Sequence, residues 1–250
     1  MSVTDLNQMN NTISSNIRPH WNYFLALEKD LEGVSRYIEF CKDNLNTYSI
    51  ELAHLLLSSA SEIDTIAKCV CSILDPKAKP KNIDQYRKII RTAEENEPGS
   101  TFHPKAAVLP ENLKHRMSDL KVLLPRYNMA LMPWKSWAED KNPDWWQSYN
   151  NVKHERSNHF NEATLRNALY SVAGLLSINY FYCRLELTRD KPQYRYQYRG
   201  KNITRYMEPT STLLRFEPDF YYDPIASLGS YIGSVSEDVH RISREMDEKD

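Results

Sequence analysis

The residues of this sequence best suited to acid–base and phosphate chemistry lie between positions 150 and 156. They are Asn150, Lys153, His154 and Arg156. An imidazole can transfer a proton near neutral pH, and a lysine or arginine can stabilise negative charge that develops on a phosphate. If this group is catalytic, His154 acts as general acid or base on RNA, Lys153 or Arg156 stabilises the phosphorane, and Asn150 orients the imidazole.

A helix is expected to carry these side chains. Asn142 can cap it, and Pro143 can occupy its first position. At about 100° per residue, Asn150 and His154 form an i,i+4 pair, whereas His154 and Arg156 lie about 200° apart around the helix. One molecule cannot easily aim both of the latter at a single phosphate, but two molecules could.

The same stretch also has a purely structural interpretation. Trp145 and Trp146 precede the polar residues and could fill the core, which would make the polar residues a solvated helix end. Residue types alone fit both interpretations.

Apolar periodicity predicts three long helices around this motif. The first covers residues 20 to 44, the second runs from about 50 to 73 and is stopped by Pro76, and the third runs from about 161 to 187. The first two are joined by a short polar connection and should pack as an antiparallel hairpin. The third is apolar on all sides and should be the central helix. Its inward-facing residues are predicted to be Leu165, Leu169, Val172, Ala173, Leu176 and Tyr180.

The second helix carries charged residues among apolar neighbours. Asp64 and Lys68 stand at i,i+4 and could form a partly exposed ion pair. Alternatively, Glu62 or Asp64 could face the polar stripe of the 142–156 helix inside the bundle. Spacing does not separate these two arrangements.

The middle of the chain is predicted to be a helix followed by an irregular insert. The helix spans residues 83 to 95, and the insert covers 96–141. Within the irregular stretch, residues 112–120 could form a short helix and 122–124 a short strand. Trp134 and Trp137 are expected to pack in the core and so to attach the insert to the helical bundle.

A basic and aromatic segment from 189 to 206 is predicted to form a small β-hairpin, because Tyr194 to Arg199 alternate with a strand period. Its cationic side chains are candidates for nucleic-acid binding: Arg195, Arg199, Lys201 and Arg205. The alternative is a surface hairpin with one tyrosine face packed on the bundle.

Composition narrows the functional classes. The formal net charge is -1, with 32 basic and 33 acidic residues, so affinity for nucleic acid must be local. The four cysteines lie in apolar helical patterns and are interpreted as core residues in a reducing compartment. The N-terminal residues lack a signal-peptide pattern, and the apolar run at 167–183 falls short of a membrane span. A cytoplasmic protein without a metal site or cofactor is expected.

Two parts of the sequence resemble the HEPN superfamily, over roughly residues 20–75 and 142–187. The first carries Tyr48-Ser49 and Ser61-Glu62-Ile63-Asp64 with Lys68, and the second carries Tyr149-Asn150-Asn151-Val152-Lys153-His154-Glu155-Arg156 at the start of the long apolar helix. The resemblance implies a bundle of four or five helices, and with the apolar periods it predicts an all-α (mostly α) bundle over residues 18–188. The polar composition of residues 1–17 predicts a disordered arm, and the hairpin and tail at 189–250 are expected to pack on the bundle.

The resemblance also implies function. HEPN proteins occur in prokaryotic defence and toxin–antitoxin systems; many are metal-independent ribonucleases, and others are non-catalytic protein- or nucleotide-binding modules. The chain is therefore expected to form a homodimer through its polar motif, with RNA, a nucleotide or a regulatory protein as further partner. It lacks the family's catalytic signature, an Arg followed after four to six residues by a His; the nearest arrangements are His154-x-Arg156 and Arg156-x-x-His159.

Overall fold

The computed structural model describes residues 3–95, 117–187, 189, 203 and 206–217. The described part is mostly helical, which confirms the predicted fold class. Its α-helices are α1 (Val3–Val34), α2 (Ile50–Leu74), α3 (Ile83–Glu95), α4 (Asp144–His154), α5 (Arg156–His159) and α6 (Leu165–Leu187).

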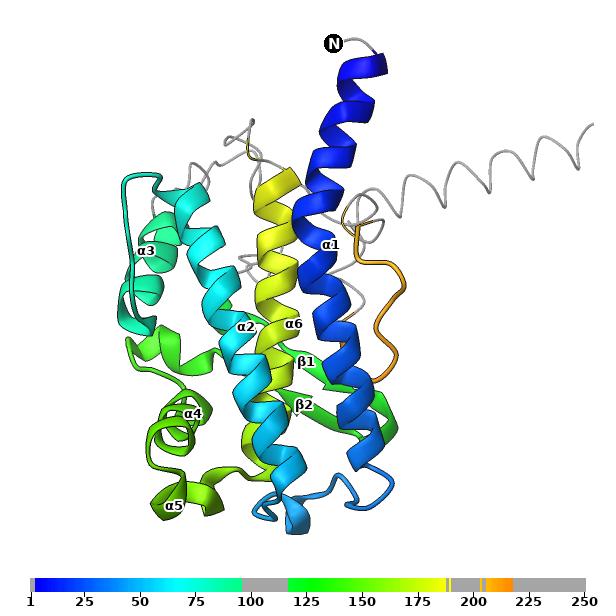
Figure 1. The fold of residues 1–250 in the computed structure, drawn as a ribbon, viewed down its shortest axis with the longest axis vertical. Helices are drawn as coiled ribbons and strands as arrows, with labels where there is room; N and C mark the ends of the chain where they lie inside the picture. Colours follow the sequence, from blue (N-terminus) through cyan, green and yellow to red (C-terminus); the bar gives the residue numbers. More distant parts are fainter. Residues whose placement is uncertain (1–2, 96–116, 188, 190–202, 204–205, 218–250) are drawn as a thin grey trace, which may run out of the picture.

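The three longest helices, α1, α2 and α6, stand side by side, and α1 runs antiparallel to both of the others (Figure 1). Helix α6 packs against both α1 and α2. The six α6 residues predicted to face inward are all buried, so the prediction of a central helix is confirmed. Close approach of α2 and α6 is shown by a buried hydrogen bond of 2.8 Å from the Ser59 hydroxyl to the Ser171 hydroxyl.

A cluster of tryptophans fills the space beside α6. The Trp134 indole donates a hydrogen bond to the Gly174 carbonyl at 3.2 Å, and the Trp145 indole donates to the Pro133 carbonyl at 2.8 Å. Trp134 and Trp137 are buried, and their rings lie 4.5 Å apart, which confirms that they pack. A Cβ on Gly174 would lie 3.2 Å from the Trp145 ring, so glycine leaves room for this cluster.

A small antiparallel sheet crosses the bundle. It has the strand order β2-β1-β3, with β1 at Val122–Leu124, β2 at Met129–Leu131 and β3 at Arg215–Phe216. Val122 pairs with Leu131 on one side and with Phe216 on the other. The predicted strand at 122–124 is therefore confirmed, and the sheet joins the insert to a segment near the end of the chain.

Helix α1 holds the 206–217 segment through a buried carboxylate. Glu28, with 3% of its surface exposed, accepts hydrogen bonds from the backbone N–H groups of Thr212, Leu213 and Leu214 at 3.1, 3.1 and 2.8 Å. The Ser211 hydroxyl donates a further one. Four donors compensate for the desolvation of this charge, so Glu28 tethers the third strand's segment to the bundle.

The bounds of α1 differ from those that the sequence predicts. The structure is helical from Val3, whereas the sequence predicts a disordered arm at 1–17. Ile17 lies one helical turn before Trp21, and both are buried, so α1 already packs on the bundle at Ile17. At the other end α1 stops at Val34 instead of continuing to residue 44, and the Ser35 hydroxyl donates to the Glu32 carbonyl at 2.7 Å. Tyr37 lies beyond this end of α1 and is 88% exposed.

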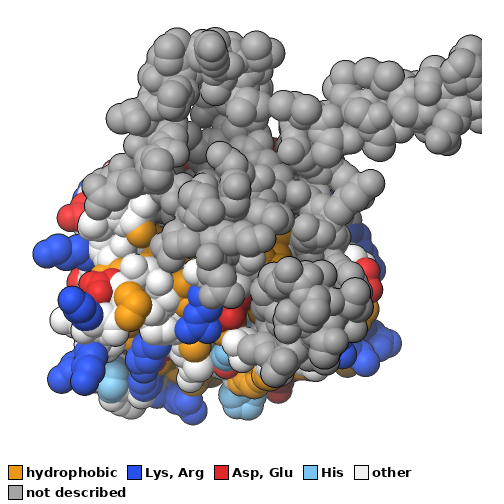
Figure 2. All heavy atoms as spheres, turned by 90° about the horizontal axis from the view of Figure 1, so that it is seen from above, with side chains coloured by type: hydrophobic (Ala, Val, Ile, Leu, Met, Phe, Trp, Pro, Cys, Tyr) orange, Lys and Arg blue, Asp and Glu red, His pale blue; other side chains and the backbone are white. Residues whose placement is uncertain are grey.

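None of the helices in the described ranges is both long and apolar enough to cross a membrane. On the face shown in Figure 2, Lys and Arg side chains gather along the left and lower edges, with acidic side chains among them. Lys77, Lys79 and Lys81 are exposed at alternate positions of the connection between α2 and α3. This connection is a second basic segment besides the predicted hairpin.

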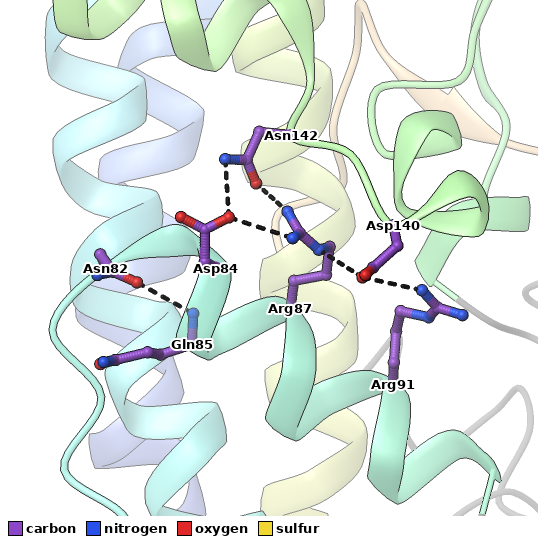
Figure 3. Close-up of polar contacts among 7 residues, drawn as sticks. All are labelled: Asn82, Asp84, Gln85, Arg87, Arg91, Asp140 and Asn142. Atoms are coloured by element: carbon purple, nitrogen blue, oxygen red, sulfur yellow. Dashed lines mark hydrogen bonds and ion pairs between the residues drawn. The ribbon is translucent and has the colours of Figure 1, made fainter.

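Helix α3 is fastened to the chain before α4 by the Arg87 guanidinium (Figure 3). Arg87 pairs with Asp140 at 3.0 Å and with Asp84 at 3.1 Å, and it donates to the Asn142 side-chain oxygen. Hydrogen bonds from Arg87, together with its charge and that of Arg91, lower the pKa of Asp140. The prediction that Asn142 caps the following helix is wrong, because its side chain belongs to this network and α4 begins at Asp144 after Pro143.

Candidate functional site

The structure separates the two residues that the sequence placed on one helix. Helix α4 ends at His154, and Glu155 adopts φ -136° and ψ 49°, so Arg156 starts the short helix α5. His154 and Arg156 are both exposed. Their expected separation of about 200° around a common helix is therefore wrong, because the helix breaks between them.

The other two predicted site residues do not converge on His154. Lys153 turns back along α4, where its Nζ donates to the Tyr149 hydroxyl at 3.1 Å and lies 5.3 Å from the centre of that ring. Asn150 is half-buried, and no hydrogen bond joins it to His154 within the described residues. The orientation of His154 by Asn150 therefore stays a prediction that no contact among the described residues supports.

An organised polar cluster does lie beside the predicted group, but it is made of other residues. The Asn151 amide donates to both Glu162 carboxylate oxygens at 3.1 and 3.0 Å, and His159 Nδ1 lies 2.6 Å from Glu162 Oε1. Partial burial raises the pKa of Glu162, but hydrogen bonds from His159, Asn151 and Ser148 outweigh it, so the net pKa is lowered. This cluster ties α4 and α5 to the turn at Phe160–Glu162, which precedes α6.

The candidate nucleic-acid residues of the predicted hairpin, Arg195, Arg199, Lys201 and Arg205, lie outside the described residues.

The charged residues of α2 face α1 and α3, not α4. Asp64 forms the ion pair with Lys68 at 2.5 Å and accepts a hydrogen bond from the Tyr86 hydroxyl of α3 at 2.8 Å. Glu62 instead reaches His20 of α1. The ion-pair interpretation is confirmed, and the alternative of a polar contact with the 142–156 helix is wrong.

The contact of Glu62 with His20 is part of a cluster of reactive side chains between α1, α2 and α6. His20 Nδ1 lies 2.5 Å from Glu62 Oε1, and the ring meets the Tyr182 ring edge-on with centroids 5.7 Å apart. Hydrogen bonds with the Cys69 side chain and with Glu62, opposed by burial, raise the pKa of His20 to about 9. His20 is therefore an imidazolium at neutral pH, flanked by a carboxylate and a thiol.

Sequence reasoning missed this cluster because it placed all four cysteines in the core. Cys71 and Cys183 are buried, and burial raises the pKa of the Cys71 thiol to about 12 and that of Cys183 as well. Cys41 and Cys69 are only half-buried. Glu62 and Cys69 stand two turns apart on one face of α2, which is a usable signal. Nothing in the spacing connects either of them with His20.

A groove of about 800 Å³ lies between the end of α1 and the start of α2. Its apolar lining includes Leu27, Val34 and Leu55, and its charged lining includes Lys29, Arg36 and Glu51. The large apolar side chains exposed in the described part all belong to these two helices and their connection: Tyr23, Tyr37, Tyr48 and Ile50.

No group of three or more His, Cys, Asp and Glu side chains within the described ranges is arranged to share a metal ion. Comparisons with protein-family models, with curated proteins and with solved structures found no match to this chain.

Proposed function

We propose that this chain is a HEPN-like protein-binding module that pairs with a second copy of itself through the groove between α1 and α2. The observation that supports this proposal is that exposed aromatic and aliphatic side chains lie in and beside the groove. Tyr37 is 88% exposed and lines the groove, and Ile50, 63% exposed, precedes its lining residue Glu51. Apolar side chains gathered beside a groove are typical of interaction sites. The family resemblance would set such a module in a prokaryotic defence or toxin–antitoxin system.

The charges of the groove support a second copy as the occupant. A two-fold interface brings a surface against itself, so it needs both a projection and a recess, and both signs of charge. Lys29 and Arg36 supply positive charge, and Asp30 and Glu51 supply negative charge. Tyr37 supplies the projection and the groove the recess, so one patch contains both halves of an interface.

The proposed interface differs from the one expected from the sequence, which included the 142–156 helix. Helix α4 already buries Trp145, Trp146, Tyr149 and Val152 within its own chain. The apolar face of α4 is therefore covered by its own chain. The apolar side chains of α1, α2 and their connection beside the groove remain exposed.

The test is the mass in solution, measured by sedimentation equilibrium over a range of concentrations. The wild type should reach twice the 29.3 kDa of one chain. Replacing both Tyr37 and Ile50 by Ser should weaken the dimer at least about tenfold, because interface aromatics carry much of the binding energy. Lys88→Ser, at an exposed position of α3, should leave the mass unchanged. A wild type that stays monomeric at every concentration overturns the proposal.

A second candidate is metal-independent ribonuclease activity at the α4–α5 junction. It is favoured by the exposure of Lys153, His154 and Arg156, which leaves them accessible to a ligand. The N-terminal ends of α2 and α6 lie at the same end of the bundle (Figure 1), and helix N-termini attract phosphate. In this role His154 is the proton-transfer group, and Lys153 or Arg156 stabilises the phosphate charge.

His154→Ala separates this activity from a structural role. Because His154 is exposed, the substitution should leave the melting temperature nearly unchanged, whereas losing a general acid or base costs roughly 10²–10⁴-fold in rate. The assay is RNA cleavage in EDTA beside a thermal melt of the same variant. A wild type that leaves RNA intact removes the ribonuclease candidate and has no bearing on self-association.

A further inference from the structure

A chain of hydrogen bonds at the α4–α5 junction ends on the imidazole of His159. The Gln147 amide donates to the Asn151 side-chain oxygen at 2.9 Å, and the Asn151 amide donates to both oxygens of Glu162 at 3.1 and 3.0 Å. His159 Nδ1 lies 2.6 Å from Glu162 Oε1. The ring is therefore held by a carboxylate that is itself held in place. By contrast, no hydrogen bond of the His154 side chain is found in the described part of the chain.

This arrangement determines which nitrogen of His159 is available to a ligand. Burial raises the pKa of Glu162, but hydrogen bonds from His159 and Asn151 outweigh it and lower the pKa, so this group is ionised at neutral pH. An ionised carboxylate only accepts hydrogen bonds, so Nδ1 must donate, and Nε2 of the neutral ring presents a lone pair. Nε2 lies 3.7 Å from Glu155 Oε2, beyond hydrogen-bond distance. The side chain is 35% exposed, so a ligand can reach this nitrogen.

A cation lies on the same face of the short helix. Arg156 precedes His159 by three residues in α5, and side chains at this spacing are neighbours. Arg156 is exposed, and the ion pairs of the described ranges do not include it. An oriented imidazole can take a proton from a hydroxyl, and a nearby guanidinium can neutralise charge that develops on a phosphate.

We propose that His159 is the general base of the α4–α5 junction, with Glu162 as its positioning residue and Arg156 as the cation that binds the reacting phosphate. The substrate class is RNA with a free 2′-hydroxyl beside the cleaved phosphodiester. This inference rests on the ribonuclease candidate above, in which His154 transfers a proton. A base must be oriented toward its hydroxyl, and the contacts of His159 supply that orientation. His154 then serves as the acid.

The reaction balances with these groups and needs no further reactant. His159 Nε2 takes the proton of the 2′-hydroxyl, and the 2′-oxygen forms a bond to phosphorus. The bond between phosphorus and the 5′-oxygen breaks, and that oxygen takes a proton from His154. The products are a 2′,3′-cyclic phosphate and a free 5′-hydroxyl. The two histidines regain their starting states by exchanging one proton each with solvent.

The test is RNA cleavage in EDTA by the full-length protein, with a thermal melt of each variant. His159→Asn retains a donor for Glu162 but has no Nε2, so it should lower kcat by roughly 10²–10⁴-fold. In His159→Gly, added imidazole should restore part of the rate, which a purely structural role of the ring would not allow. If the glycine variant fails to fold, the asparagine variant decides. Wild-type activity in His159→Asn, or a folded glycine variant that imidazole does not rescue, overturns the assignment and leaves His154 as the candidate. A wild type that leaves RNA intact removes the assignment together with the ribonuclease candidate.

Glu162→Gln and Glu155→Gln test the positioning role as a matched pair. Both remove one carboxylate beside the His159 ring, but only Glu162 holds Nδ1. Glu162→Gln should lower kcat at least about tenfold, because the ring can then adopt the wrong tautomer. KM should not change, since Glu162 does not touch the substrate. Glu155→Gln should leave kcat unchanged. An equal loss in both variants, or a loss in neither, overturns the role of Glu162.

Discussion

At the scale of single residues, packing of α1 against α2 determines the charge of His20. Its side chain is only 17% exposed, and it meets Glu62 where α1 packs against α2. The interactions with Cys69 and Glu62 raise the pKa of His20 to about 9. They outweigh burial, which disfavours the charged form of the ring and lowers its pKa. The charged ring therefore contributes to the free energy of unfolding in a pH-dependent way.

The direction of this dependence follows from the pKa values. The folded-state pKa of His20, about 9, lies above its ordinary value of 6.5. The stabilisation is fully present below pH 6.5 and is lost as the pH rises through about 9, on the order of 1–3 kcal/mol. Urea unfolding of the wild type and of Glu62→Gln between pH 6 and 10 measures it. The variant should show a clearly smaller loss over this range, and equal slopes for the two proteins would refute this origin of the pH dependence.

At the scale of elements, the packing of α6 depends on a glycine. Gly174 and Gly33 are both helical, but a Cβ on Gly174 would lie 3.2 Å from the Trp145 ring, whereas one on Gly33 would meet nothing within 4 Å. Trp145 is held by its hydrogen bond to the Pro133 carbonyl and is buried. Trp145 therefore cannot move aside easily. An alanine at Gly174 should lower the stability of the protein, whereas an alanine at Gly33 should raise it.

Gly33→Ala should raise the free energy of unfolding by roughly 0.5–1 kcal/mol, because alanine restricts the unfolded chain and favours helix. Gly174→Ala should lower it by about 1 kcal/mol, since overpacking against the tryptophan exceeds that gain. Chemical denaturation of both variants gives the comparison. A Gly174→Ala protein as stable as Gly33→Ala would mean that the tryptophan cluster moves aside.

At the scale of the whole molecule, a net charge of -1 leaves affinity for polyanions to local segments. Two segments compete for this role. One is the sequence-predicted hairpin with Arg195, Arg199, Lys201 and Arg205, and the other is the α2–α3 connection with Lys77, Lys79 and Lys81 exposed. The hairpin adds interleaved tyrosines, on which bases can stack.

We therefore expect RNA binding, measured as a function of salt, to depend on the hairpin. Replacing Arg195, Arg199 and Arg205 by Ala should weaken binding and flatten the salt dependence, by about one unit of slope for each phosphate that the protein no longer neutralises. Replacing Lys77, Lys79 and Lys81 by Ala is the charge-matched control and should have the smaller effect. The reverse order would assign RNA binding to the α2–α3 connection, and a wild type without salt-dependent binding would make the hairpin structural.

Much of the fold can be predicted from the sequence because its determinants are local. The bounds of α3, Ile83–Glu95, and of β1, Val122–Leu124, agree with those predicted. For α6 the informative feature is its apolar character on all sides, which matches its burial on every face. Apolar spacing and proline positions act over a few residues, so they can be recognised along the chain. Residue types likewise reveal the motif at 150–156, but they do not determine its geometry.

What only the tertiary structure decided involves partners distant in sequence. Asn142 binds Arg87 instead of capping a helix, the helix breaks at Glu155, and His20 meets Glu62 from another helix. A side chain's protonation and partners depend on which elements pack against it, and that packing minimises the free energy of the whole core. No local spacing encodes such a choice.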